Sequence, residues 1–172
     1  MPVRTYHPNG NGTTQDWRGD TDFSNIDDGT EAPDVPGTDA CFGIHTGSFN
    51  DSGLSCEWST SNIGSHSGET TTNFRVYIYV DGLVNPPASV SCKINGSWQS
   101  DKATKDGTDG DWDYYDFAAS HSIGSGMSDL QIRVTCPTFS IGQQAGIDGA
   151  YLEVSSVETG NPWNYFAQQG GI

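Results

Sequence analysis

One stretch of sequence decides the fold: residues 74–80, FRVYIYV, followed by the turn-forming pair Asp81-Gly82. The even positions of this stretch are apolar, and Arg75, Tyr77 and Tyr79 alternate with them. Successive side chains of a β-strand point to opposite faces of its sheet, so a period of two indicates a strand that is buried on one face. We therefore predict a strand here, with Arg75 and the two tyrosines on the face turned away from the core.

Similar short runs continue on both sides of this strand and are separated by polar, glycine-rich loops. They cover residues 40–45, 54–58, 90–94, 112–117, 130–136 and 149–157. The loop at 47–53 is typical of a hairpin between the first two runs. No segment has an apolar period of 3.6, so helices should be short or absent. The pattern predicts an all-β protein, a two-sheet antiparallel β-sandwich of seven or eight strands. Central early and late strands would favour a jelly-roll over an immunoglobulin topology.

A chain of 172 residues fits one domain. We assign residues 16–159 to the β-sandwich domain. Residues 1–15 are rich in turn formers and are expected to form an extended N-terminal arm with one early strand. Residues 160–172 are expected to be an extended C-terminal tail, whose Trp163, Tyr165 and Phe166 fit no strand pattern. Solvated aromatics would be costly there, so we predict that these three side chains make assembly contacts.

The composition excludes several classes of partner. Hydrophobic residues are only 33% of the chain, but 5 Trp, 7 Tyr and 7 Phe provide enough buried area for a folded core. The net charge of −15 would repel phosphate backbones and anionic lipid surfaces, so we expect neither nucleic acid nor membrane as a partner. No apolar run approaches the roughly 20 residues of a membrane span. The first residues show no apolar signal segment, so export would need another route or a cleaved precursor.

Four cysteines offer disulfide candidates, Cys41, Cys56, Cys92 and Cys136. Their spacing contains no zinc-ligand motif. Cys92 shares its strand face with apolar neighbours, and so does Cys136, so both are expected to point into the core. The preferred pairings are Cys41–Cys56, across a hairpin-sized loop, and Cys92–Cys136. The alternative is four buried free thiols in a protein made in a reducing cytoplasm.

Catalytic and metal motifs are few. The four histidines lie in different loops or strands, and no nucleophile elbow or zinc-protease helix is present, so we expect no enzyme. Calcium is the candidate cofactor, because the loop at 106–113 places Asp106, Asp109, Asp111 and Asp113 among glycines, and calcium favours several oxygen ligands. A second acidic cluster lies at 27–39. Both clusters lack the spacing of an EF-hand, and solvated loop acids are the alternative.

The segment from Trp17 to Ala40, which contains FSNIDDG at 23–29 and Pro33-Asp34, resembles a β-sandwich domain of tailed-bacteriophage and prophage structural proteins. The ending GAYLEV at 149–154 is similar to the last strand of that family. Cys41 replaces the usual aromatic residue, and Asp28 replaces a glutamate. The resemblance implies a jelly roll in which the last strand is the sheet neighbour of residues 74–80. Its implied role is in virion structure, without a catalytic mechanism.

That neighbourhood would bring Tyr151 beside Tyr77 and Tyr79. A flat aromatic row on a β-sandwich could stack sugar rings, as carbohydrate-binding modules do. The same row could be covered by the N-terminal arm or by a neighbouring subunit, and we favour covering.

Together these observations predict a non-enzymatic virion structural protein. The expected form is a capsid decoration or tail accessory subunit that contacts other virion proteins and forms homo-oligomers. The alternative is a secreted carbohydrate-binding module that uses the aromatic sheet face. A weaker alternative is a small polysaccharide-active enzyme.

Overall fold

The computed structural model describes residues 2–17, 21–26, 41–44, 54–80, 87–104, 111–135, 144–147 and 149–159. Within these ranges the chain forms twelve β-strands and one short 3-10 turn. The strands are β1 (Val3–Tyr6), β2 (Pro8–Gln15), β3 (Cys41–Ile44), β4 (Ser55–Thr60), β5 (Glu69–Val80), β6 (Ser89–Ile94), β7 (Ser97–Trp98), β8 (Lys102–Ala103), β9 (Asp111–Phe117), β10 (Gln131–Thr135), β11 (Gln144–Ile147) and β12 (Gly149–Glu158); the turn is η1 (Phe23–Asn25).

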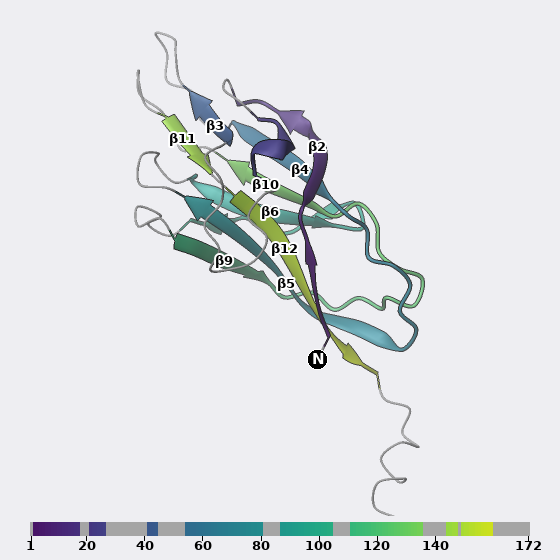
Figure 1. Ribbon diagram of the computed structural model, residues 1–172. Helices are drawn as coiled ribbons and strands as arrows, with labels where there is room; N and C mark the ends of the chain where they lie inside the picture. Colours follow the sequence, from purple (N-terminus) through teal and green to yellow (C-terminus); the bar gives the residue numbers. More distant parts are fainter. Residues whose placement is uncertain are drawn as a thin grey trace, which may run out of the picture.

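Two antiparallel sheets lie face to face and form a sandwich (Figure 1). Sheet A has the strand order β1-β12-β5-β9, and sheet B has the order β2-β4-β10-β6-β7 with β8 added beside β6. A separate two-stranded sheet pairs β11 with β3. The predicted all-β, jelly-roll-like sandwich is confirmed. The structure has more strands than the seven or eight expected, because several short or polar strands carry no apolar alternation.

The core fills the space between the two sheets. Phe74, Val76 and Ile78 of β5 point inward and are at most 1% exposed, which confirms the alternation read from the sequence. Trp58 of β4 is fully buried, and its indole nitrogen donates a hydrogen bond of 2.9 Å to the Thr21 carbonyl. Phe74, Val76 and Ile78 therefore belong to the core, and Arg75 and Tyr77 between them lie on the opposite face.

Residues 1–15 do not form the arm expected from the sequence. β1 pairs with β12 in sheet A, with Val3 opposite Ser155, and β2 pairs with β4 in sheet B. β2 lies so close to β4 that a Cβ placed on Gly12 would come within 2.5 Å of the Glu57 Cβ. The Glu57 carboxylate also accepts a hydrogen bond of 3.0 Å from the Thr14 amide. A polar, glycine-rich segment thus becomes a strand through its partner strand.

The predicted hairpin between residues 40–45 and 54–58 is also wrong. β3 pairs with β11, whereas β4 pairs with β2 and β10. The apolar run of β3 is long enough for a strand, but its partner comes from residues about a hundred positions later. The tail at 160–172 and its predicted assembly contacts lie outside the described residues.

The two preferred disulfides do not form, because Cys56 and Cys92 are free and buried. Cys41 lies on β3 in the small sheet, whereas Cys56 lies on β4, where its thiol donates to the Gln15 side-chain oxygen at 3.0 Å. Cys92 faces the core as predicted, but the residue opposite it on β10 is Ile132, four positions before Cys136 in the chain. Cys136 itself lies outside the described residues.

Candidate functional site

The outer face of sheet A carries a row of three tyrosines from three neighbouring strands. Tyr77 of β5 lies opposite Tyr151 of β12 on one side and opposite Tyr114 of β9 on the other. The Tyr77 and Tyr151 rings stack, with centroids 4.4 Å apart and planes 13° from parallel. Tyr114 is tilted against Tyr77, with centroids 6.0 Å apart. This row exists because the three tyrosines are direct register partners on neighbouring strands, and such partners point to the same face of a sheet.

A second aromatic row lies next to the first. Tyr79 pairs with Trp112 across β5 and β9, and their rings meet edge to face at 5.4 Å. Trp112 also makes an edge contact with Tyr151 at 5.0 Å. Together Tyr77, Tyr79, Trp112, Tyr114 and Tyr151 make one continuous group, which we call the aromatic face.

The members of the aromatic face differ in how far they are open to solvent. Tyr79 and Tyr151 are buried, at 7% and 3% exposure. Tyr77 and Trp112 are half-buried, and Tyr114 is exposed at 45%. A ligand would therefore meet Tyr114, Trp112 and Tyr77 first, with the buried pair holding them in position.

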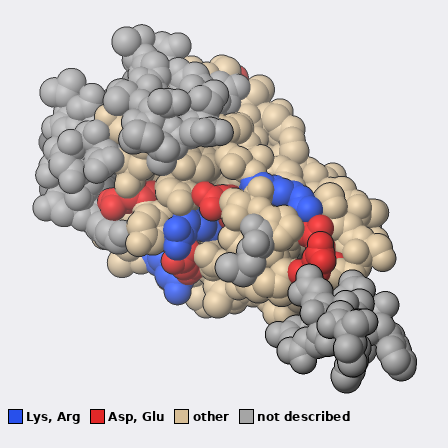
Figure 2. Space-filling view, turned by 60° about the horizontal axis from the view of Figure 1, so that its bottom comes forward, with Lys and Arg blue, Asp and Glu red and all other residues tan. Residues whose placement is uncertain are grey.

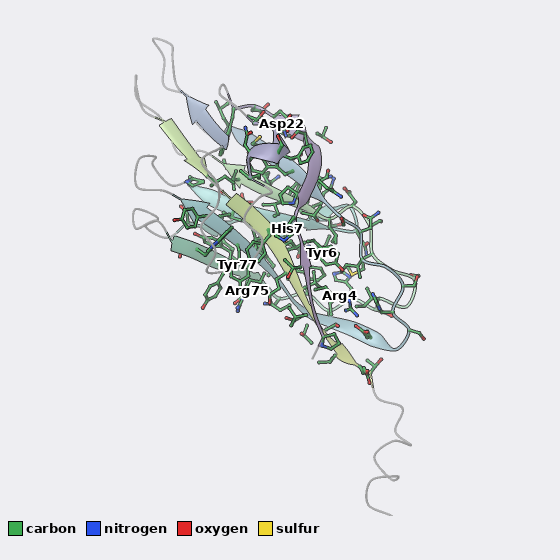
Figure 3. The ribbon with its side chains drawn as sticks, in the orientation of Figure 1. Arg4, Tyr6, His7, Asp22, Arg75 and Tyr77 are labelled. Carbon is green, nitrogen blue, oxygen red and sulfur yellow. The ribbon has the colours of Figure 1, made fainter. Side chains whose placement is uncertain are left out.

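A polar row borders the tyrosine row on the same face. Arg75 of β5 donates to both carboxylate oxygens of Asp116 on β9, at 2.6 and 2.9 Å. The guanidinium carbon lies 4.2 Å from the Tyr114 ring centroid, over the ring face. These bonds to Asp116, followed by the one to the Tyr77 hydroxyl, raise the pKa of Arg75 above its usual value. Figure 3 shows Arg75 and Tyr77 side by side on this part of the sheet.

Glu153 of β12 lies on the other side of Arg75, directly opposite it in the register. The polar row thus contains one cation between two carboxylates. Figure 2 shows basic and acidic side chains next to one another in this view rather than gathered into a patch of one sign. The row offers both hydrogen-bond donors and acceptors without an excess of positive charge.

These two kinds of surface together suit a ligand that is apolar on one side and rich in hydroxyls at its edges. The apolar C–H face of a ring can pack on an aromatic side chain, and its hydroxyls can bond to neighbouring polar groups. Stacking of Tyr77 on Tyr151 occupies one ring face of each, and Arg75 covers one face of Tyr114. The solvent-accessible parts of Tyr114, Trp112 and Tyr77 therefore form the contact surface.

The sequence singled out Tyr77, Tyr79 and Tyr151, and the structure brings all three together on one sheet face. The predicted neighbourhood of the last strand and residues 74–80 is confirmed. The N-terminal segment contributes to one margin of the face: β1 extends sheet A at the edge of β12, and the His7 ring that follows it lies 5.6 Å from the Tyr151 ring, centroid to centroid. Sequence reasoning missed Trp112 and Tyr114. The signal for them was the alternation within residues 112–117, read for its strand but not for its faces.

The candidate calcium loop lies mostly outside the described residues. Asp113 is half-buried on β9, opposite Ile78, whereas Asp106 and Asp109 and the side chain of Asp111 are not among the described residues. In the part of the chain that the structure describes, no group of three or more His, Cys, Asp or Glu side chains could hold a metal ion. The same part contains no helix long and apolar enough to cross a membrane. Calcium at 106–113 stays a prediction.

A pocket of about 490 Å³ lies away from the aromatic face. Its lining includes Asn62, Asn95 and Ser128, and Ile63 and Met127 pair across its base by backbone hydrogen bonds of 2.9 and 3.0 Å. No acidic, basic or thiol side chain lines it. The pocket therefore lacks the titratable groups that acid–base or nucleophilic catalysis requires.

No protein-family model and no curated protein matches this chain. Several solved structures have a similar arrangement of strands. A family 35 carbohydrate-binding module from an environmental isolate is 14% identical, with a TM-score of 0.44 over 94% of this chain and 100% of the module. The C-terminal family 6 module of a marine laminarinase from Zobellia galactanivorans is 10% identical, with a TM-score of 0.43 over 90% and 99%. A family 35 module from Paenibacillus barcinonensis is 14% identical, with a TM-score of 0.42 over 91% and 98%.

The virion structural role expected from the sequence is wrong, because the solved structures that resemble this chain are carbohydrate-binding modules rather than capsid or tail proteins. The short motifs that suggested a phage domain are too brief to identify a family. At 10–14% identity and TM-scores below 0.5, the likeness assigns no ligand to this chain. A ligand has to be argued from its own surface.

Proposed function

We propose that this protein is a non-catalytic carbohydrate-binding module and that the aromatic face of sheet A holds the sugar. The observation that supports the proposal is Tyr114, which is 45% exposed beside half-buried Tyr77 and Trp112 and borders the Arg75–Asp116 pair. Soluble proteins seldom expose grouped aromatics without a binding role. A secreted location goes with this proposal, since most structural polysaccharides lie outside cells.

A carbohydrate fits this surface better than other ligand classes. The charge of −15 disfavours nucleic acid and anionic lipid, as stated above. The members of the aromatic face come from three neighbouring strands, so a long polymer can lie across them and contact several side chains at once. Because few groups are desolvated in such a contact, we expect dissociation constants in the micromolar to millimolar range, on the order of −4 to −8 kcal/mol.

The test is affinity electrophoresis of the whole chain in gels that contain a panel of soluble polysaccharides. Binding to each polysaccharide that slows the migration of the protein is then measured by calorimetry. Tyr114→Ala and Trp112→Ala should each weaken binding by about tenfold, because each removes about 1–2 kcal/mol of ring contact. The matched control is Trp98→Ala. Trp98 is also a half-buried aromatic, but it lies on β7 in sheet B.

Two outcomes would overturn the proposal. One is a panel in which no polysaccharide binds. The other is a glycan whose binding is lost in Trp98→Ala and kept in the Tyr114 and Trp112 variants, since that would move the site to sheet B. Melting curves of each variant show that a loss of binding does not come from unfolding.

A further inference from the structure

We infer that Asp116 and Glu153 make the aromatic face selective for neutral glycans over acidic ones. This inference rests on the proposed function and names its class of ligand. Asp116 pairs with Arg75, and Glu153 lies opposite Arg75 on the other neighbouring strand, so Arg75 acts as a hydrogen-bond donor to a hydroxyl and not as a free cation for a carboxylate.

Arg75 and Asp116 form a bidentate pair. Two nitrogens of the guanidinium bind the two oxygens of one carboxylate, at 2.6 and 2.9 Å, which is the strongest arrangement for this pair of groups. The Asn73 side-chain amide donates at 2.6 Å to Oδ1 of Asp116, the oxygen that also accepts from Nε of Arg75, and so holds the carboxylate in place further. An acidic sugar could engage the charge of Arg75 only by displacing a partner that is already in place.

The charges of the polar row, Arg75 with Asp116 and Glu153, do not cancel. Arg75 faces Asp116 across β9 and Glu153 across β12, so the three side chains sum to one negative charge. The chain as a whole carries −15, with only 7 Lys and Arg against 22 Asp and Glu. A ligand carboxylate on the aromatic face would therefore meet repulsion nearby and from the protein as a whole.

The polar row also complements the hydrogen-bonding groups of a neutral sugar. A sugar hydroxyl both donates and accepts, so neighbouring hydroxyls pair well with a row that contains carboxylate acceptors and a guanidinium donor. A uronate carboxylate at neutral pH only accepts. It could use Arg75 but would leave the oxygens of Asp116 and Glu153 facing another anion. The row is thus matched to hydroxyls along its whole length.

The experiment compares one glycan in two forms. The neutral polysaccharide that binds best in the panel is oxidised at its primary alcohols to the uronate form, and both forms are titrated against the wild type, Asp116→Asn and Glu153→Gln. The wild type should prefer the neutral form, and the preference should weaken as salt rises. Each variant should shift the ratio of the two affinities toward the uronate form by roughly two- to fivefold, the size of a surface charge pair.

Asp116→Asn also disrupts the pair that positions Arg75, so its effect could come from a displaced guanidinium. Glu153→Gln is the control for this, because it removes a carboxylate and leaves the Arg75–Asp116 pair intact. A wild type that binds the uronate form as tightly as the neutral form, or variants that leave the ratio unchanged, would overturn the selectivity while the proposed function stands. If no glycan binds, the proposed function and the selectivity fall together.

Discussion

The Arg4 guanidinium binds both carboxylate oxygens of Glu69, at 2.8 and 3.0 Å, and so joins the first strand of the protein to the start of its longest strand. Ser156 of β12 donates to the same carboxylate at 2.6 Å. The His66 ring nitrogen Nδ1 lies 3.2 Å from the guanidinium. Three strands of sheet A thus meet at one partly buried ion pair, which holds an otherwise short and exposed edge strand in place.

This ion pair gives the stability of the protein a definite pH dependence. The hydrogen bonds from Arg4, then that from Ser156, lower the pKa of Glu69 to about 2 from its usual 4.5. A carboxyl whose pKa is lower in the folded state stabilises the fold above pH 4.5, and that contribution is lost as the pH falls toward 2. We expect the melting temperature of Glu69→Gln to be below that of the wild type at pH 7, and the gap to narrow between pH 4.5 and 2.

The matched control for this measurement is Asp16→Asn, an exposed carboxylate that directly follows β2 of sheet B. Its difference from the wild type should stay small and constant over the same range. A gap for Glu69→Gln that is unchanged from pH 7 to pH 2 would show that the ion pair adds nothing to stability.

The close approach of β2 to β4 predicts a contrast between two glycines. An alanine Cβ at Gly12 would lie 2.5 Å from the Glu57 Cβ and 2.9 Å from its backbone, whereas one at Gly10 would have its nearest neighbour at 4.0 Å. Gly12→Ala should lower the free energy of unfolding by about 1–3 kcal/mol, because β2 must move away from β4. Gly10→Ala should change it by less than about 1 kcal/mol. Denaturant titration of both variants measures the contrast, and equal values would disprove it.

The buried thiols predict a second contrast, in chemical reactivity. Burial raises the pKa of both Cys56 and Cys92 to about 12, so almost no thiolate forms near neutral pH. In a Cys41→Ser, Cys136→Ser background we expect no labelling by a thiol-specific disulfide reagent at pH 8, and labelling of both thiols after denaturation. Rapid labelling of the native protein would show that sheet B opens to solvent or that these side chains are not enclosed.

Trp58 provides a test of the core. Trp58→Phe removes the donor to the Thr21 carbonyl and leaves space in a fully buried position. We expect a loss of about 1–3 kcal/mol in the free energy of unfolding. Trp98→Phe, at a half-buried position, should cost less than about 0.5 kcal/mol. Similar losses at the two positions would mean that Trp58 is not the central residue of this core.

The sequence predicted those strands whose one face is buried and whose other face is polar. Residues 74–80 show the alternation because the core needs Phe74, Val76 and Ile78 on one side. The first five residues of β5 and all of β2 show none, since they are mostly polar and are held in place by pairing with neighbouring strands. A local pattern cannot reveal a strand whose stabilising contacts come from a distant part of the chain.

The candidate site was predicted in part for a related reason. Tyr77 and Tyr151 stand out in the sequence because each lies between two apolar residues. On β9, however, both faces of the strand carry aromatic side chains, with Trp112 and Tyr114 on one face and Tyr115 and Phe117 on the other. The sequence of β9 alone does not say which pair faces the core. Only the register with β5, in which Tyr114 lies opposite Tyr77, decides it.

The pairing of β1 with β12 also determines how the sandwich can be joined to other proteins. The Ser156 amide donates to the Pro2 carbonyl at 3.0 Å, so residue 2 and the last residues of β12 lie side by side in sheet A, as Figure 1 shows. A catalytic domain fused before residue 2 or after residue 159 would be attached at nearly the same point of sheet A. Its position relative to the aromatic face would therefore be similar in the two fusions. The whole sandwich could equally be spliced into a surface loop of a host enzyme, since the two ends of the insert already meet.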